Sequence, residues 1–386
     1  MRSNYSRLGD YIREVNVRNR KLEVTKLLGV SIQKRFIPSI ANTIGTDMST
    51  YKIVTRGQFA YGPVTSRNGD KVSIALLSEC DSAIISQAYT VFEVIDNSEL
   101  LPEYLMMWFM RPEFDRYARY KSHGSAREIF DWSEMCDVEL PIPLPEKQRA
   151  IVKEYQTLTD RIKLNETLCT KLEQTAQALY RKMFIDNIDS ENLPDGWRMG
   201  TIGDIGKVIT GKTPSSQNPE DFGYDMMFVS PSDFKNNNKF IFKTDRMLSK
   251  SGYMRLSNKI ISPNNLLVTC IGSDMGKVKI TDAECVTNQQ INAIILNSHS
   301  YLNYLYYLLN KMSSELKSMA LGSSTMPMLS KSEFERIKFL IPNDKIVYEF
   351  NGVCSKINNV ESSLLKENSY LYKIKSMLLS KISTIN

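Results

Sequence analysis

Residues 146–185 read EKQRAIVKEYQTLTDRIKLNETLCTKLEQTAQALYRKMFI, and this stretch decides how the chain is built. Its apolar residues recur in alternating steps of three and four, which is the heptad pattern of a helix that buries one stripe. Asn165 fills the one gap in the stripe, and no proline interrupts it. The pattern predicts one helix of about 35–40 residues. The residues expected in its pairing stripe are Ile151, Leu158, Ile162, Leu172 and Leu179.

A second stretch, residues 343–386, has the same pattern, and Glu367 fills its gap. Because neither stripe can stay exposed to water, we expect the two helices to pair as an antiparallel coiled coil. Matched centres would place Asn165 opposite Glu367, where a hydrogen bond would fix the register. Two unrelated surface interruptions are the alternative. The pairing residues expected on this second helix are Ile357, Val360, Leu364, Leu371, Ile374 and Leu378.

The segments that precede the two helices resemble each other. Leu8-Gly9-Asp10 corresponds to Ile202-Gly203-Asp204, and five further pairs follow in the same order, the last being Val138–Pro143 and Ile337–Pro342. Corresponding positions differ by 194 (Leu8 and Ile202) to 202 residues (Ser86 and Asn288). Such order indicates a duplicated unit of about 195 residues, made of a domain and a long helix.

Each domain is predicted to be mixed α/β, with short strands and one helix. The predicted helices cover Glu103–Tyr120 in the first domain and Tyr301–Met319 in the second. Runs of β-branched and aromatic residues between Gly, Asn and Pro predict the strands, of which the clearest are Lys71–Leu77, Tyr89–Ile95, Asn265–Ile271 and Ile291–Leu296.

Composition excludes several classes of protein. Hydrophobic residues make up 42% and charged residues 24%, as in ordinary globular domains rather than disordered or fibrous chains. Six scattered cysteines and two histidines provide no zinc-binding pattern, so no metal site is expected. No apolar run approaches the ~20 residues of a membrane span, and no secretory signal begins the sequence, so we expect a cytoplasmic protein. The net charge of +6 is compatible with a nucleic-acid partner.

One catalytic motif is only apparent. Gly206–Thr213 matches the letters of a phosphate-binding P-loop, which requires a helix that begins at its lysine. Pro214 and Pro219 follow among turn-forming residues, so that helix cannot form. The sequence also has no Pro-Pro dipeptide of an adenine methyltransferase and no Gly-x-Ser-x-Gly elbow of a hydrolase. We therefore expect no catalytic residue and favour a binding role.

Basic clusters recur at corresponding places in the two halves. Seven cations and one acid lie between Lys235 and Lys259, and seven cations and two acids lie between Arg13 and Arg35. Lysine and arginine clusters of this kind contact phosphates, while amides and hydroxyls on loops read base edges. A solvated face and ordinary turn chemistry are the alternatives. The candidate DNA-binding residues are Lys34, Arg35, Tyr61, Arg67, Asn68, His123, Ser125, Arg127, Lys212, Thr213, Ser215, Lys235, Asn236, Asn237, Asn238, Lys239, Ser273, Lys277, Gln289, Gln290 and Ser323.

Over its whole length the chain resembles the specificity (S) subunits of type I restriction–modification systems. Leu193-Pro194-Asp195-Gly196-Trp197 resembles the family's entry into a target-recognition domain, and Gly211-Lys212-Thr213-Pro214-Ser215 resembles its Gly-x-Thr-Pro-Ser loop. Phe59-Ala60-Tyr61 is similar to a strand motif of the family, and Leu140–Pro143 with Glu146–Gln148 is similar to its exit into the helix. The second exit lacks the Glu-x-Gln pattern, and the first half lacks the Leu-Pro-x-Gly-Trp opening.

The resemblance implies two target-recognition domains, residues 1–145 and 186–342, and two spacer helices, residues 146–185 and 343–386, related by a pseudo-twofold axis. Each domain would read one half of a bipartite double-stranded DNA target, and the helices would act as a ruler between the half-sites. The implied partners are two methyltransferase (M) subunits, which bind S-adenosylmethionine and methylate adenine N6, and two restriction (R) subunits, which use ATP and Mg²⁺. No cofactor is expected in this chain. The alternatives are a DNA-recognition subunit of a related modification-only or nuclease-fused system, and a scaffold that does not bind DNA.

Overall fold

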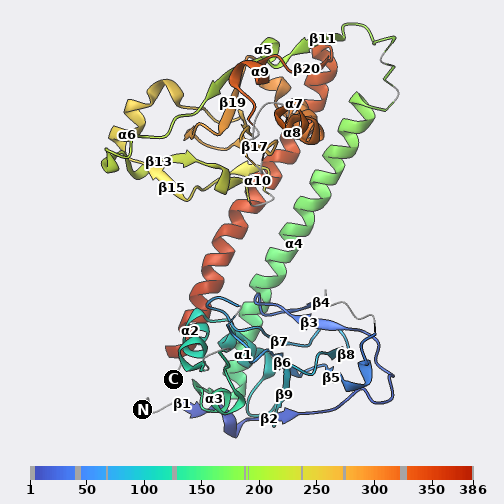
Figure 1. Ribbon diagram of the computed structural model, residues 1–386, viewed down its shortest axis with the longest axis vertical. Helices are drawn as coiled ribbons and strands as arrows, with labels where there is room; N and C mark the ends of the chain where they lie inside the picture. Colours follow the sequence, from blue (N-terminus) through green and yellow to red (C-terminus); the bar gives the residue numbers. More distant parts are fainter. Residues whose placement is uncertain are drawn as a thin grey trace. The chain divides into compact units, whose positions relative to one another are not determined.

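The computed structural model describes residues 5–39, 45–66, 68–123, 128–186, 188–189, 191–235, 238–272, 275–321 and 328–384. The chain forms two compact units. Unit 1 comprises the residues up to Leu164 and those from Ser369 onward, and unit 2 comprises Asn165–Asn368. The long helices α4 (Pro145–Phe184) and α10 (Asp344–Lys381) each contribute residues to both units (Figure 1).

Unit 1 is built around a four-stranded antiparallel sheet with the order β2-β9-β6-β7. Its strands are β2 (Ile12–Val15), β9 (Thr90–Val94), β6 (Phe59–Tyr61) and β7 (Ile74–Leu76). Three strand pairs surround it: β1 (Tyr5–Arg7) with β10 (Glu139–Pro141), β3 (Leu28–Val30) with β4 (Phe36–Pro38), and β5 (Lys52–Thr55) with β8 (Ser82–Ile85). Its short helices are α1 (Pro102–Phe109), α2 (Pro112–Lys121), α3 (Trp132–Cys136) and the 3-10 turns η1 (Leu8–Asp10) and η2 (Met48–Thr50).

Unit 2 repeats this sheet and extends it. The strands β12 (Gly206–Thr210), β19 (Ile291–Leu296), β16 (Leu266–Thr269) and β17 (Val278–Thr281) lie in the order β12-β19-β16-β17, and β14 (Phe240–Ile241) adds a parallel edge to β17. A second sheet joins β15 (Arg246–Leu248), β13 (Phe222–Val229) and β18 (Cys285–Thr287), and β11 (Arg198–Thr201) pairs with β20 (Lys338–Ile341). The other elements of unit 2 are α5 (Ile202–Ile205), α6 (Lys250–Arg255), α7 (Leu302–Lys311), α8 (Ser313–Leu321), α9 (Lys331–Glu335) and the 3-10 turns η3 (Pro219–Asp221), η4 (Pro231–Phe234), η5 (Ser257–Lys259) and η6 (His299–Tyr301). The last 3-10 turn, η7 (Ile382–Thr384), follows α10 and belongs to unit 1.

The internal repeat is thus visible in three dimensions. Strands β2, β9, β6 and β7 have the same order and antiparallel pairing as β12, β19, β16 and β17. A tyrosine contact also repeats between the units. Tyr104 of α1 donates from its hydroxyl to the carbonyl of Pro141 (3.0 Å), and Tyr304 of α7 donates to the carbonyl of Leu340. The mixed α/β duplication expected from the sequence is therefore the observed fold.

Each predicted domain helix is in fact two helices. The stretch Glu103–Tyr120 divides into α1 and α2, because Pro112 cannot continue a preceding helix and begins a new one instead. The stretch Tyr301–Met319 divides at Met312 into α7 and α8. The predicted strand Ile291–Leu296 coincides with β19, whereas Lys71–Leu77 shortens to β7.

The start of each long helix is fixed by a different side chain. In unit 1, buried Gln148 accepts from the N–H of Leu101 (2.8 Å) and donates to the carbonyls of Glu99 and Pro143 (2.7 and 2.8 Å). In unit 2, Asn343 caps α10 by accepting from the N–H of Ile346 (3.1 Å) and donates to the carbonyl of Asp195 (3.0 Å). The start of α10 is therefore tied to the Leu193–Trp197 turn through Asn343, whereas the start of α4 is tied to the domain through Gln148.

The two long helices run antiparallel within unit 2. Asn165 Nδ2 donates to Asn368 Oδ1 (2.8 Å) and to Glu367 Oε2 (3.1 Å), and fifteen residues further along α4 Tyr180 stacks near Phe350, with ring centroids 6.1 Å apart. The Asn165–Glu367 contact is the one that matched helix centres predict. The two helices also contact each other within unit 1, where the Lys375 ammonium lies 4.5 Å from the Tyr155 ring centroid.

The predicted stripe of α10 is wrong at two of its positions. Val360 and Ile374 are exposed, at 45% and 49% of their surface, as is Val353 at 48%. The buried side of α10 instead carries Phe350, Cys354, Ile357, Asn358, Glu361 and Asn368. Polar residues enter the buried side because α7 offers them a partner: Asn303 donates to Asn351 (2.8 Å) and accepts from Asn358 (2.9 Å). The apolar row of Val353, Val360 and Ile374 is displaced to solvent.

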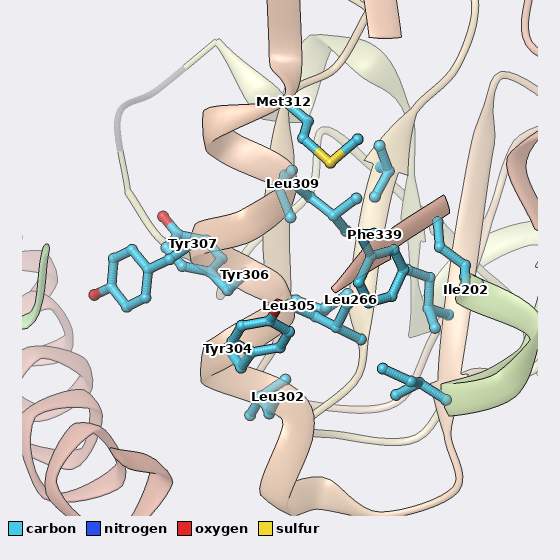
Figure 2. Packing of buried hydrophobic residues seen from close by; sticks show 14 of the residues in the cluster. Ile202, Leu266, Leu302, Tyr304, Leu305, Tyr306, Tyr307, Leu309, Met312 and Phe339 are labelled. Carbon is cyan, nitrogen blue, oxygen red and sulfur yellow. The ribbon is translucent and has the colours of Figure 1, made fainter. Parts of the chain in front are cut away.

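Helix α7 has two buried faces in unit 2. Figure 2 shows Leu305 and Leu309 directed toward Leu266 and Phe339 of the domain, with Tyr307 on the other side of the helix. On that other side, Tyr307 packs against Tyr180 of α4 (5.6 Å between ring centroids) and Phe350 of α10 (6.0 Å). The domain and the two long helices of unit 2 therefore share one apolar core.

A buried ionic cluster lies beside these tyrosines. Lys239 Nζ donates to Tyr307 Oη (2.8 Å) and to Glu173 Oε2 (3.3 Å), and Tyr307 Oη donates to the same Glu173 oxygen (3.0 Å). Glu361 Oε2 lies 3.9 Å from Lys239 Nζ, and this oxygen and Asn358 Oδ1 are buried without a hydrogen-bond partner among the described residues.

Burial raises the pKa of Glu361 from 4.5 to about 7. The positive charge of Lys239 lowers this pKa in part, and the negative charge of Glu173 raises it further. Its folded pKa lies above its unfolded value, so its contribution to stability is complete below about pH 4.5 and is lost as the pH rises through 7. The Glu361→Gln variant keeps the shape of the side chain and a hydrogen-bond donor but cannot ionise. We therefore expect its unfolding free energy, relative to that of the parent, to rise by about 1–3 kcal/mol between pH 4.5 and pH 7.5. Urea unfolding of both proteins at the two pH values measures this change. Glu349→Gln, at an exposed position of α10, is the control. A difference between the parent and Glu361→Gln that stays constant with pH would contradict the prediction.

Replacement of Asn165 by alanine removes two hydrogen bonds from the buried contact between α4 and α10. We expect a loss of about 1–3 kcal/mol in unfolding free energy, because the partner groups become buried without this donor. Lys171→Ala, an exposed substitution on the same helix, should stay within about 0.5 kcal/mol. Equal effects of the two substitutions in urea titrations would show that the Asn165 contact is unimportant for the pairing.

Candidate nucleic-acid interface

A loop at the end of β12 forms the centre of the candidate interface in unit 2. Gly211 donates its N–H to the carbonyl of Ile291 (3.2 Å), and Lys212 donates to that of Thr287 (2.9 Å). A Cβ atom on Gly211 would lie 2.2 Å from the Thr287 carbonyl oxygen, so only glycine permits this close approach. Thr213 Oγ1 donates to Gln289 Oε1 (2.6 Å). The loop after β12 and the turn between β18 and β19 are thereby one surface.

Two more loops adjoin this surface. Gln290 accepts at its carbonyl from the N–H of Cys270 (2.8 Å), which joins it to the end of β16. The loop from β16 to β17 closes where Lys277 donates its N–H to Thr269 Oγ1 (3.0 Å). The structure thus brings together five predicted residues from three loops, with Ser215 exposed on the first of them: Lys212, Thr213, Lys277, Gln289 and Gln290.

Sequence reasoning missed Asn288, which organises the turn. Its N–H donates to the carbonyl of Val229 (3.0 Å) and its Nδ2 donates to Gln290 Oε1 (3.0 Å). The first bond also fastens the start of η4 to the turn. The run of amides after Thr287 was the signal that could have identified it, since Asn side chains commonly bond their own turn backbone.

Lys235 and Asn238 lie exposed at the far end of η4. Asp233 holds η4 in place by accepting from the N–H of Ser230 (2.8 Å). Lys279 Nζ donates to the carbonyl of Asn238, and burial, together with the positive charge of Lys277, lowers the pKa of Lys279 to about 8. A nearby phosphate would raise that pKa again, because an anion favours the charged ammonium.

Unit 1 has a corresponding pair of loops. Asn68 Nδ2 donates to the carbonyl of Val64 (3.2 Å), and Val64 and His123 both form bridges with Ile129. His123 is exposed, so Asn68 and His123 lie on neighbouring loops. Arg35 is also exposed, in the β3–β4 hairpin, where its carbonyl accepts from Ser31 (3.0 Å).

Three predicted DNA contacts are wrong because the side chains are internal. Lys34 is 8% exposed and donates to Asp115 (2.6 Å) and to the carbonyl of Phe109 (2.5 Å). Tyr61 is fully buried, since both faces of β6 are covered, and burial raises the pKa of its hydroxyl. Lys239 is 7% exposed and belongs to the ionic cluster of Glu173, Tyr307 and Glu361. A lysine within a basic stretch of sequence can therefore form a buried salt bridge instead of contacting DNA.

Seven predicted contacts lie outside the described residues: Arg67, Ser125, Arg127, Asn236, Asn237, Ser273 and Ser323.

The described part of the chain offers little to catalysis. The P-loop-like Gly206–Thr213 is strand β12 followed by an extended loop, and the next ordered turn is η3 rather than a helix beginning at Lys212. Among the described residues, no group of three or more His, Cys, Asp or Glu side chains is placed to hold a metal ion. Within the same residues, no helix is both long and apolar enough to cross a bilayer. Amides, hydroxyls and lysines on rigidly tied loops are instead the chemistry of base and phosphate contacts.

Comparisons with known proteins agree with this geometry. Residues 194–351 match the model of the type I restriction modification DNA specificity domain. The chain is 26% identical to the type I restriction enzyme HindI specificity subunit of Haemophilus influenzae, over 86% of either chain. It is 29% identical to the MjaIX specificity subunit of Methanocaldococcus jannaschii over 48% of this chain and 43% of that protein. The crystal structure of the type I restriction–modification S subunit from M. genitalium has the same fold, with a TM-score of 0.66, 12% identity and coverage of 98% of this chain and 95% of that chain. Residues 194–351 thus match a type I restriction modification DNA specificity domain, and over most of its length the chain is similar to a type I specificity subunit.

Proposed function

We propose that units 1 and 2 each read one half of a bipartite DNA target. The function of the chain is DNA-sequence recognition within a type I restriction–modification complex, and as a specificity subunit it is not itself catalytic. The observation that carries the bipartite reading is the repeated four-stranded sheet, beside which polar side chains lie on loops in both units, such as Gln289 in unit 2 and Asn68 in unit 1. Two similar readers in one chain favour two half-sites.

The loop surface of unit 2 has the donors and acceptors that base reading requires. Glutamine presents both a donor and an acceptor and pairs with adenine N6 and N7 in the major groove, which suits Gln289 and Gln290. Lys212 and Lys277 supply positive charge for phosphates, whose contacts position a protein without specifying sequence. The hydrogen bond of Thr213 to Gln289 holds the amide in a defined orientation before DNA arrives.

The long helices support a spacing role and a docking role. Since α4 and α10 each contribute to both units, helix length is a natural determinant of the gap between the half-sites. Val353 and Val360 are seven residues apart, Ile374 follows fourteen residues later, and all three are exposed on α10 as an apolar row. Exposed rows of this kind mark interaction surfaces. We assign this row to the methyltransferase subunits.

The partners would supply the chemistry. The chain assembles into a restriction–modification complex with DNA as its target. In our proposal that complex contains two methyltransferase subunits, which bind S-adenosylmethionine and methylate adenine N6, and two restriction subunits, which use ATP and Mg²⁺. This chain would hold none of these cofactors, and the complex would act in the cytoplasm on incoming foreign DNA.

Exchange of residues 186–342 for those of another family member tests the two-reader assignment. We expect one half of the methylated DNA motif to change while the other half and the gap stay the same, because each unit carries its own sheet and loops. Sequencing of genomic DNA with detection of modified adenine measures the motif in cells with and without the gene. Simultaneous change of both half-sites would contradict separate readers.

Gln289→Ala tests the loop surface of unit 2. We expect about a 10–100-fold loss of discrimination at one base position in one half-site, because the amide that reads the base edge is gone. Gln174→Ala, at an exposed position of α4, is the matched control and should leave the motif unchanged. Methylation frequency at each position of the motif is the measurement, and an unaltered motif in the Gln289 variant would remove this residue from the interface.

A further inference from the structure

A basic cleft lies beside the first reading loop of unit 2. It has a volume of about 290 Å³, and its wall includes Lys207 of β12, Asn258 and Lys259 of η5, and Lys331 of α9. The rest of the wall is Val208, Ile209 and Thr210, so no carboxylate lines it. We call this the lysine cleft. Thr210 is followed directly by the Gly211–Ser215 loop, which makes the cleft continuous with the candidate interface.

The three ammonium groups of the lysine cleft are only partly compensated. Lys259 Nζ donates to the carbonyl of Thr210 (3.0 Å), a neutral group that fixes the side chain without cancelling its charge. Lys331 has a carboxylate nearby, Glu335, at 3.4 Å, and this ion pair is partly exposed. Lys207 is exposed on the outward-facing side of β12. Three cations from separate elements therefore meet with a single acid at the margin.

The backbone of β12 adds donors to the cleft. β12 is an edge strand, paired only with β19 among the described strands. Asn297 donates to the carbonyl of Ile205, and Gly211 donates to that of Ile291, so the residues at 205, 207, 209 and 211 exchange bonds with β19. In an antiparallel ladder the alternate residues point the other way. The N–H groups of Val208 and Thr210 are thus directed away from β19, on the side where Lys259 approaches.

We propose that the lysine cleft binds one phosphate of the DNA backbone next to the half-site read by unit 2. Lysine ammonium groups, an amide and free edge N–H groups are the donors that a phosphodiester oxygen accepts, and such contacts set the register of a protein on DNA. The inference rests on the proposed function of the loop surface and adds to it a sequence-independent anchor. It assigns roles to Lys207, Lys259 and Lys331, which share no motif.

The test compares the salt dependence of DNA binding by the complex of the full chain with its methyltransferase subunits. The variant carries Lys207→Gln, Lys259→Gln and Lys331→Gln together. A control carries Lys171→Gln, Lys182→Gln and Lys356→Gln, three exposed lysines of α4 and α10 with the same total change in charge. Assembly of both complexes is checked first by size-exclusion chromatography, and Lys207→Gln alone serves if the triple variant does not fold.

Fluorescence anisotropy is measured between 50 and 200 mM KCl with two unmethylated duplexes. One contains the motif that is found methylated in cells with the gene, and the other contains the same bases in shuffled order. Loss of one phosphate contact lowers the slope of log K against log salt by about 0.9. We expect that change in the cleft variant, an equal fold-loss of affinity for both duplexes, an unaltered methylation motif and recovery of the slope by the three Lys→Arg substitutions. The control should keep the parental slope.

Three results would overturn the assignment: a parental slope in the cleft variant, a loss confined to the motif duplex, or binding of inorganic phosphate by the parent that the variant loses without any change in its DNA slope. Failure of the proposed function is recognised separately. In that case the parent complex itself would bind the two duplexes equally, whatever the cleft variant does.

Discussion

Burial of one side of each long helix against a sheet domain is the constraint on which the rest of the structure depends. An amphipathic helix of 40 residues, such as α4, is not stable with its apolar side in water. In unit 2 that side is covered by α7, whose Tyr307 contacts both Tyr180 of α4 and Phe350 of α10. The aromatic cluster joins reader and helices into one core, so the orientation of the loop surface on the helices is set by packing.

Polar groups inside this core restrict how the elements can be arranged. An apolar seam tolerates a shift of the helices, but Asn165 must remain beside Glu367 and Asn368 to keep its hydrogen bonds. Lys239 has the same effect between the domain and the helices, because a displaced ammonium would lose Tyr307 and Glu173 and remain buried. Buried polar contacts thus trade stability for a defined register. Defined register is what a protein needs if two readers are to meet DNA at a fixed separation.

The sequence was informative where a pattern repeats and misleading where a local pattern depends on tertiary partners. Heptad spacing located both long helices to within a few residues, and the offset between halves identified the duplicated sheet. Val360 was assigned to the helix seam because it is apolar and correctly spaced, but Asn358 and Glu361 occupy the buried side instead. Nothing in the spacing of α10 reveals that Asn303 on α7 accepts a hydrogen bond from Asn358.

The same reasoning explains why two of the candidate DNA contacts lie inside the protein. Lys34 and Lys239 lie in basic runs, yet each is enclosed by carboxylates and aromatic rings that are distant in sequence. The lysines that meet at the edge of β12 come instead from three separate elements, and no run of sequence contains them together. Charge density along the chain indicated the partner, whereas the position of each charge was decided by strand order and by the close approach of Gly211 to Thr287. A binding face assembled from loops is therefore a property of the sheet that carries them, and it becomes visible only when the strands are in place.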